Sequence, residues 1–362
     1  MYPALAVLQA LEEIAETSQP SFEVQTLWVG GINGMEVDLV KREGINFEGI
    51  PAAGVHGVGV SALPGNLMKL SKGYQASRKI LSHYQPDVLF FTGGYVAVPM
   101  ATAGRSVPSL LYVPDIEPGL ALKTLARFAD RIAVTADESR AYFSDDRKVM
   151  VSGYPTRPDL LDWTEADARE ALGLAGEKPV LLVFGGSKGA RSINRALLPV
   201  LDQMLEEMEI VHITGSLDWE EVSQVATTLP AELAPSYHAF PYLHRRMGAA
   251  LRAANLVLSR AGASTLGEFP AFALPAILVP YPHAWRYQRV NAEYLAQHGA
   301  ALIIEDQDLP DRILSQVREL MRDRQRLEGM RQQMGALAKP DAAQKIAHQL
   351  LEMGAGTRQE RM

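Results

Sequence analysis

The chain has 362 residues, a formal net charge of −7 and no cysteine. At about 150 residues per domain, this length predicts two domains. Hydrophobic residues make up 47% and charged residues 21% of the chain, which is typical of a folded globular protein. The lack of cysteine excludes disulfides and thiolate metal sites, and the acidic balance gives no positive field for nucleic acid. No apolar run approaches the roughly 18 residues that span a bilayer, so we expect a protein on the cytosolic side of the membrane.

Short runs rich in valine, isoleucine and leucine alternate with segments of helical period, which is the pattern of βαβ units in a parallel sheet. We expect strands at 24–29, 87–91, 109–113, 131–134 and 148–152, and a second series at 180–184, 209–214, 236–240, 255–259, 276–279 and 300–303. The pattern predicts an α/β protein with two doubly wound domains and a cleft between them.

The segment Gly153–Pro158 is typical of an interdomain link. We therefore predict an N-terminal domain at 1–155 and a C-terminal domain at 156–340. A helix at 341–353 is expected to pack across the domain junction, and residues 354–362 are expected to form a tail.

The first residues predict a helix from Tyr2, with Pro3 in its first turn. In a doubly wound domain such a helix normally follows a buried strand and a glycine-rich turn. We therefore expect that the N-terminal domain of this chain lacks its first strand and the turn after it.

The sharpest motif is the strand at 180–184 followed by the glycine-rich loop Gly185–Ala190 and a helix from about Arg191. Glycines let the backbone approach a phosphate, and free N–H groups at a helix start favour an anion. The spacing matches neither Walker A nor the dinucleotide fingerprint. A plain tight turn between strand and helix is the alternative.

A second loop, Arg260–Ser264, leads into a helix that contains Glu268. A glutamate three residues after Thr265 can form a capping box with the helix start. A carboxylate at the mouth of a parallel sheet can instead accept the hydroxyls of a ribose.

The third segment follows the strand at 276–279 and contains His283, Gln288 and Asn291. A carboxamide both donates and accepts hydrogen bonds, which suits sugar hydroxyls. The alternative is an ordinary polar helix start.

Taken together, these segments resemble family 28 glycosyltransferases. The resemblance runs from Tyr2 to about the end of the last helix. It is carried by Tyr2–Ala6, Gly34–Glu36, Thr92–Val96, Pro118–Leu120, Gly153–Arg157, Gly185–Ala190 with Asn194, Ser259–Thr265 with Glu268, and Pro280 through Gln288 to Asn291 and Ala292. It implies the GT-B fold, in which two Rossmann-like domains bind the donor mainly through the C-terminal domain and the acceptor through the N-terminal one.

The resemblance also implies which residues bind substrate. Ser187 and the loop amides would hold a diphosphate, Glu268 the ribose, and Gln288 the sugar. The uracil would meet backbone groups near Tyr242 and Leu243, although His244, Arg245 and Arg246 replace the usual acidic pair. The expected set is Gly185, Gly186, Ser187, Gly189, Asn194, Leu243, Gly262, Ala263, Ser264, Thr265, Glu268, Gln288 and Asn291, with Gly93, Gly94, Tyr95 and Arg157. No metal or cofactor is expected, because Asp306-Gln307-Asp308 is typical of a helix start.

The implied activity is an inverting transfer of N-acetylglucosamine from UDP-N-acetylglucosamine to undecaprenyl-pyrophosphoryl-MurNAc-pentapeptide, the lipid I to lipid II step of peptidoglycan synthesis. The family's histidine before the first helix is absent, and its His-Glu-Gln-Asn motif aligns with Tyr112–Asp115. Asp115 is the remaining candidate for the general base. Turn formation beside Pro114 is the alternative.

The segment Leu63–Ile80 mixes apolar residues with lysine and arginine. Basic residues around apolar ones suit an anionic membrane surface, where each adds about 1 kcal/mol. The alternative is a solvated amphipathic helix. We expect a peripheral protein on the cytoplasmic face of the cell membrane that binds no nucleic acid.

Two other functions stay open. One is a family 28 enzyme with another acceptor, such as diacylglycerol. The other is a non-catalytic relative that binds a nucleotide sugar, because polar residues of the family's motifs are missing.

Overall fold

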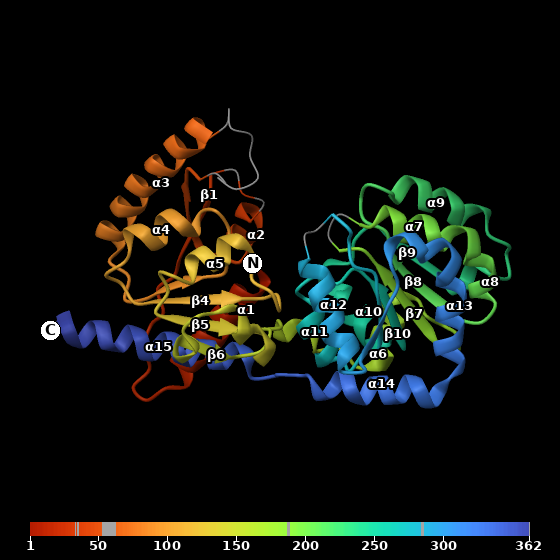
Figure 1. Cartoon of the computed structure of the whole chain (residues 1–362). Coiled ribbons are helices and arrows are strands. Elements are labelled where there is room, and N and C mark those ends of the chain that lie inside the picture. The colour runs from red at the N-terminus through yellow and green to blue at the C-terminus, as the bar shows by residue number, and fades with distance from the viewer. Residues whose placement is uncertain (33, 35, 53–62, 187–188, 284–285, 362) are drawn as a thin grey trace. The chain divides into compact units, whose positions relative to one another are not determined.

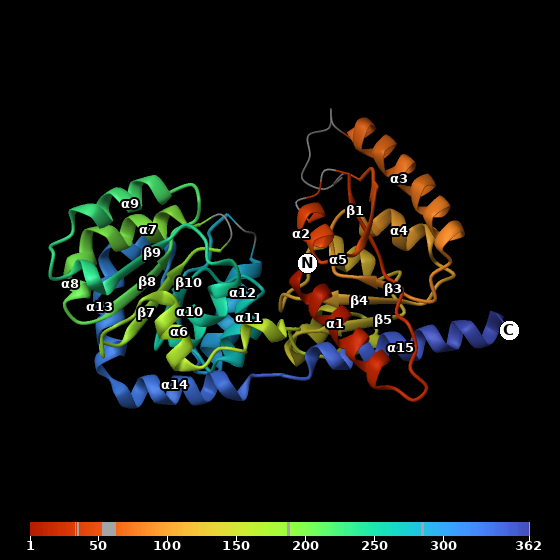
Figure 2. The same ribbon diagram turned by 180° about the vertical axis from the view of Figure 1, so that it is seen from behind.

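A computed structural model of the chain describes residues 1–32, 34, 36–52, 63–186, 189–283 and 286–361, without the side chains of 63, 64, 67 and 357–361. Its contacts divide the chain into two compact units (Figures 1 and 2). Unit 1 comprises Met1–Pro114, Pro118–Pro155 and Asp341–Met362, and unit 2 comprises Asp115–Glu117 and Thr156–Pro340. Both units have parallel strands with helices packed on them, so the α/β prediction is confirmed.

Unit 1 contains two parallel sheets. Strands β3 (Leu89–Phe91), β4 (Ser109–Val113), β5 (Arg131–Val134) and β6 (Val149–Val151) pair in that order. Strand β1 (Leu27–Gly31) pairs with β2 (Asn46–Ile50) in a separate sheet. Every residue of β4 is buried, as expected of a parallel strand that is covered on both faces.

The helices of unit 1 are α1 (Tyr2–Thr17), α2 (Val37–Arg42), α3 (Leu63–Tyr84), α4 (Ala97–Ala103), α5 (Leu120–Leu125) and α15 (Ala342–Arg361). Helices α4 and α5 cover the sheet face that contains Leu111 and Val113. Helices α1 and α15 pack against each other through alanines, which let two helices approach closely (Figure 2). Among the described residues, no helix is long and apolar enough to cross a membrane.

Two features of unit 1 differ from the sequence-based expectation. The predicted tail at 354–362 is wrong, because α15 continues through Arg361. Gly354 lies close to Asp87 and Val88. Strand β2 was not predicted, because its sequence Asn46–Ile50 has only one fully buried apolar residue.

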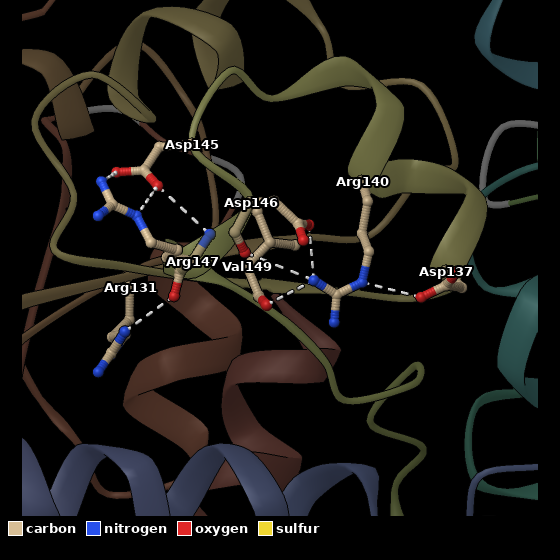
Figure 3. Close-up of polar contacts among 7 residues, drawn as sticks. All are labelled: Arg131, Asp137, Arg140, Asp145, Asp146, Arg147 and Val149. Atoms are coloured by element: carbon tan, nitrogen blue, oxygen red, sulfur yellow. Dashed lines mark hydrogen bonds and ion pairs between the residues drawn. The ribbon is translucent and has the colours of Figure 1, made fainter.

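An ion-pair cluster holds the connection between β5 and β6 (Figure 3). The guanidinium of Arg140 contacts Asp137 at 2.8 Å and Asp146 at 2.7 Å, and it donates to the carbonyl of Val149 at 2.9 Å. This connection contains the short 3-10 helices Asp137–Tyr142 and Asp146–Lys148. The cluster fixes the start of β6 against the turn that follows β5.

Unit 2 is built on one parallel sheet. Its described strands are β7 (Val180–Phe184), β8 (Glu209–Ile213), β9 (Tyr237–Phe240), β10 (Leu256–Ser259), β11 (Ala276–Leu278) and β12 (Ala301–Ile303). They lie in the order β12-β11-β10-β7-β8-β9. The chain therefore runs outward from β7 in one direction and then returns to add β10 on the other side of β7. In such sheets a ligand crevice opens where the order reverses, here between β7 and β10.

The helices of unit 2 are α6 (Glu165–Leu172), α7 (Arg191–Leu197), α8 (Leu201–Leu205), α9 (Trp219–Thr228), α10 (Met247–Ala253), α11 (Thr265–Ala271), α12 (Tyr287–Gln297), α13 (Leu309–Arg322) and α14 (Arg324–Ala336). Helices α7, α8, α9 and α13 form the core with Leu181 and Val183 on one sheet face. On the other face, the ring of Phe184 meets that of Phe269 in α11 at 6.1 Å. The sheet is thus covered on both faces, as in a doubly wound domain.

Candidate functional site

The three predicted donor segments follow neighbouring strands of the unit 2 sheet. Phe184, the last residue of β7, pairs with Ser259 of β10, and Ser259 pairs with Leu278 of β11. Because the strands are parallel, the loops that follow them leave the same edge of the sheet. The loops after β7 and β10 flank the point where the strand order reverses.

The glycine-rich loop after β7 has a backbone that favours glycine. Gly186 has a φ of 98° and Gly189 a φ of 78°, which side chains rarely allow. At Gly185, a Cβ atom would lie 2.2 Å from the Cβ of Ala190. Ser187 lies outside the described residues. Gly185, Gly186 and Gly189 therefore have backbone positions that favour glycine, which is the residue type that close approach to a phosphate requires.

Asn194 was expected to bind substrate, and the structure places it under this loop. Its side chain is 1% exposed, and its amide bonds to other protein groups. A buried amide whose polar atoms are already paired is not oriented toward a ligand.

Glu268 lies in the first turn of α11, and its side chain is partly exposed. The helix is capped at Ser264 without a side-chain capping bond, so the capping box is not formed. Burial raises the pKa of Glu268 to about 7, while the charge of Arg157 and a hydrogen bond with the Ser264 side chain act to lower it. The carboxylate thus lies at the mouth of the sheet, with the side chain of the N-cap residue Ser264 as a partner.

The other residues of the β10 loop line the same edge. Gly262, Ala263 and Ser264 are partly exposed, and no described atom lies within 4 Å of a Cβ built on Gly262. Thr265 is buried and donates its hydroxyl to the carbonyl of Gly262 at 2.7 Å. This bond shapes the loop and occupies the Thr265 hydroxyl as a donor.

Gln288 and Asn291 lie one turn apart in α12. Gln288 accepts a bond from the backbone N–H of Tyr281 at 2.9 Å, and this is the only hydrogen bond of its side chain within the described residues. Its amide nitrogen can therefore donate to a ligand.

Asn291 is fully buried and holds the segment Asp115–Glu117 on unit 2. Its Nδ2 donates to the Asp115 carboxylate at 2.8 Å and to the carbonyl of Ala261 at 3.1 Å, and its Oδ1 accepts from the N–H of Ile116 at 3.1 Å. Arg286 adds an ion pair with Glu117 at 2.9 Å. The sequence assigned this segment to the N-terminal domain, but these contacts make it part of the unit that carries the glycine-rich loop and the β10 loop.

Asp115 is partly buried and is the second residue of the loop after β4. Burial raises the pKa of its carboxyl above the ordinary range, and the hydrogen bond from Asn291 acts in the opposite direction. Asn291 is the only hydrogen-bond partner of this carboxylate among the described residues. Tyr112 is the first of the four residues that align with the family's His-Glu-Gln-Asn motif. It is buried, and its hydroxyl is hydrogen-bonded to the hydroxyl of Thr135 at 3.0 Å.

The segment expected to meet a uracil lies between β9 and α10. Leu243 is buried, so any contact that it makes there goes through its backbone. His244 has a φ of 45° and its ring stacks edge-on against Tyr242 at 4.4 Å.

Gly93, Gly94 and Tyr95 form the turn after β3 in unit 1. Both glycines have positive φ angles, and the side chain of Tyr95 is 53% exposed. Arg157 belongs to unit 2, where it pairs with Asp159 at 3.3 Å. These four residues stay candidates for substrate binding.

Arg260 is a buried residue of the β10 loop that sequence reasoning did not single out. It donates to the hydroxyl of Ser192 at 2.6 Å and pairs with Asp306 at 2.5 Å. Asp306 lies in a 3-10 turn directly before α13. No three histidine or acidic side chains gather as a metal site among the described residues.

Comparisons with known proteins agree with this architecture. A model of the glycosyltransferase family 28 C-terminal domain matches residues 180–346, and one of the N-terminal domain matches residues 1–134. A crystal structure of Acinetobacter baumannii MurG superposes with a TM-score of 0.74 at 25% identity, over 97% of this chain and 95% of that one. The structure of UDP-GlcNAc 2-epimerase from Neisseria meningitidis bound to UDP-GlcNAc shares the fold, with a TM-score of 0.67 at 11% identity over 97% of this chain and 98% of that one.

Two curated relatives are each 37% identical to this chain. The one from Roseiflexus sp. (strain RS-1) covers 96% of this chain and 91% of the relative, and the one from Desulforudis audaxviator (strain MP104C) covers 99% and 96%. Both are named UDP-N-acetylglucosamine--N-acetylmuramyl-(pentapeptide) pyrophosphoryl-undecaprenol N-acetylglucosamine transferase. The two α/β units and the superposition on the MurG structure identify the GT-B fold, and the two domain models identify a glycosyltransferase. The chain belongs to glycosyltransferase family 28, as its motifs predicted.

Proposed function

We propose that this chain transfers N-acetylglucosamine from UDP-N-acetylglucosamine to undecaprenyl-pyrophosphoryl-MurNAc-pentapeptide, converting lipid I to lipid II. The observation that carries the proposal is the pair of loops after β7 and β10, which flank the strand reversal with a glycine-rich turn on one side and Glu268 on the other. The names of the two 37%-identical relatives support the choice of donor and acceptor.

In this proposal each donor segment binds one part of UDP-N-acetylglucosamine. The backbone of Gly185–Ala190 binds the diphosphate, because glycines allow close approach. Glu268 accepts the ribose hydroxyls, the backbone near Leu243 meets the uracil, and Gln288 donates its free amide nitrogen to the sugar. A carboxylate and N–H groups can do this without a metal ion.

The proposed reaction inverts the anomeric carbon. A hydroxyl of the acceptor forms a new carbon–oxygen bond as the bond between that carbon and UDP breaks, and a base accepts the hydroxyl proton. We assign the base to Asp115, because its carboxylate is held by Asn291 beside the β10 loop and burial raises its pKa. The N–H groups of the glycine-rich loop stabilise the charge that develops on the diphosphate.

The lipid-linked acceptor requires access to a membrane surface. In α3, the side chain of Met68 is exposed, and the same helix exposes four basic residues, which are Lys69, Lys72, Arg78 and Lys79. We propose that this helix contacts anionic lipids at the cytoplasmic face of the cell membrane, with each basic residue adding about 1 kcal/mol. Leu67, which the same expectation included, lies outside the described side chains.

The test is a transfer assay with radiolabelled UDP-N-acetylglucosamine and three acceptors: lipid I in vesicles, diacylglycerol in the same vesicles, and vesicles alone. Product from lipid I alone supports the proposal, whereas product from diacylglycerol would identify diacylglycerol as the acceptor in place of lipid I. Binding of UDP-N-acetylglucosamine with no product from any acceptor would identify a non-catalytic relative, in line with the replacement of the family's His-Glu-Gln residues by Tyr112–Pro114.

A further inference from the structure

Under the glycine-rich loop lies a buried polar network that joins α7 to the end of β8. Asn194, His212 and Asp218 are 1%, 0% and 4% exposed. Nδ2 of Asn194 donates to Asp218 at 2.8 Å, and its Oδ1 lies 2.9 Å from Nε2 of His212. The other ring nitrogen of His212 lies 2.7 Å from the hydroxyl of Tyr237.

The hydrogen-bonding capacity of Asn194 is used within the protein. Its two amide hydrogens reach Asp218 and the carbonyl of Thr214, at 2.8 and 3.0 Å. These two acceptors fix the orientation of the amide, so Oδ1 must face His212. Nε2 of His212 therefore carries the hydrogen, and Nδ1 accepts from Tyr237. The side chain of Asn194 has no amide hydrogen left for a ligand, contrary to the substrate-binding role expected from the sequence.

The network touches the loop backbone at two points. The carbonyl oxygen of Thr214, which accepts from Asn194, would lie 2.2 Å from a Cβ on Gly189, so the loop rests directly on this carbonyl. Asp218 also pairs with Arg191 at 2.8 Å, one residue after the loop ends. The position of Thr214 and Asp218 therefore sets the position of Gly189 and Arg191.

We propose that Asn194, His212 and Asp218 are positioning residues that set the backbone from Gly189 to Arg191, at the end of the glycine-rich loop, for the diphosphate, and that none of them contacts the nucleotide. The inference rests on the proposed diphosphate role of that loop. Backbone N–H groups stabilise a charge only when they are held in place before the charge develops. A network anchored in β8 and β9 supplies that rigidity from below the loop.

The test compares Asp218→Ala with a matched control, Glu209→Ala. Both variants remove a buried carboxylate that pairs with an arginine, and both positions adjoin β8. Glu209 lies at the start of β8, at the opposite sheet edge from the loop, where it contacts Arg169 and His238. A general loss of stability should therefore appear in both variants. Displacement of the glycine-rich loop should appear only in Asp218→Ala.

The readout is the affinity of each folded variant for UDP and for uridine, measured by competition against labelled UDP-N-acetylglucosamine. Asp218→Ala should lower the affinity for UDP by about tenfold and leave the affinity for uridine unchanged. Glu209→Ala should leave the ratio of the UDP affinity to the uridine affinity as in the wild type. Asp218→Asn, which keeps an oxygen acceptor, should restore part of the UDP affinity. If Asp218→Ala does not fold, the ratio of UDP affinity to uridine affinity in Asp218→Asn alone tests the proposal.

An unchanged UDP-to-uridine ratio in both Asp218 variants would overturn the positioning role. Failure of the wild type to bind UDP is a different result, since it would remove the proposed function of the loop before the network is tested.

Discussion

Asn291 donates a hydrogen bond of 2.8 Å to Asp115, which lies 176 positions away in the chain. The same nitrogen of Asn291 donates to Ala261 in the β10 loop, so one buried amide places the carboxylate beside the donor segments. This relationship gives the proposed base a fixed position and one defined partner.

Replacing the proposed base should separate binding from turnover. Asp115→Asn keeps the shape of the side chain but cannot accept a proton, so the transfer rate should fall by about 10²–10⁴. Affinity for UDP-N-acetylglucosamine should stay near the wild-type value. The control is Glu117→Gln, two residues on, whose partner Arg286 can still donate to the amide. Equal rates in Asp115→Asn and the wild type would assign the base to another residue.

Removing the partner of Asp115 should move the pH profile. The hydrogen bond from Asn291 lowers the pKa of Asp115 against the effect of burial, so Asn291→Ala should raise that pKa. A base acts only when ionised, and the acid limb of the kcat/KM profile should therefore shift to higher pH. A profile that keeps its midpoint while its height falls would mean that Asn291 does not tune the base.

Binding of the donor should depend on the ionisation of Glu268. Because burial raises its pKa to about 7, the carboxyl is largely protonated at pH 6 and ionised at pH 8. A ribose donates better to the ionised form, so affinity for UDP-N-acetylglucosamine should weaken by up to about tenfold per pH unit below 7. Glu268→Gln should bind more weakly by about 1–3 kcal/mol at pH 8 and lose the pH dependence. Calorimetry between pH 6 and pH 8 measures these affinities. The same pH dependence of affinity in Glu268→Gln and the wild type would contradict the assignment of Glu268 to the ribose.

Two glycines of the same loop should respond differently to alanine. Gly189 has a positive φ and a carbonyl oxygen 2.2 Å from the added Cβ, whereas at Gly186 the φ is positive and no described atom lies within 4 Å. Left-handed backbone costs an ordinary residue about 1–2 kcal/mol, and only Gly189→Ala adds the clash. UDP affinity should therefore fall further in Gly189→Ala than in Gly186→Ala. Titration of both variants with UDP measures the difference, which would vanish if the loop did not bind the diphosphate.

His212 should make the protein sensitive to acid. Burial lowers its pKa from 6.5 to about 3, although the charge of Asp218 acts to raise it. Below pH 6.5 the unfolded chain binds a proton that the folded chain does not, so the free energy of unfolding falls as pH decreases toward 3. One proton corresponds to about 1.36 kcal/mol per pH unit.

The matching variant is His212→Gln, which keeps hydrogen-bonding groups and does not titrate. Urea unfolding between pH 7 and 5 should show a shallower pH dependence in this variant than in the wild type. Identical slopes would mean that the folded protein protonates His212 in this range.

Strands were predictable wherever burial on both faces leaves a continuous apolar run. The strands at 109–113, 131–134 and 180–184 are confirmed residue for residue. Strand β2 lacks such a run, because Ile50 is its only fully buried residue and the strand is placed by its pairing with β1. The glycine-rich loop was predictable for a related reason, since positive φ angles leave a visible glycine pattern.

The roles of polar residues were less predictable. Asn194 and Gln288 are both carboxamides near donor motifs, yet one is saturated by protein groups and the other has a free donor. Spacing does not distinguish the two cases, because the partners of Asn194 come from β8 and the loop after it. A signal existed for His212, since a histidine between Val211 and Ile213 in a buried strand must have polar partners. Arg260 had no such signal.

The strand reversal of unit 2 also governs when a binding site can exist during synthesis. Strand β7 carries one side of the crevice and β10 the other, and the bond between the N–H of Val180 and the side chain of Asn255 joins residues 75 positions apart. Such non-local pairing is slow, because a long loop must close before any contact rewards it. A nascent chain that has been synthesised only as far as Ser259 contains the glycine-rich loop but lacks the β10 loop on the other side of the strand reversal. Under the proposed function, nucleotide binding requires that the chain has passed this point, so the donor would stabilise only such chains.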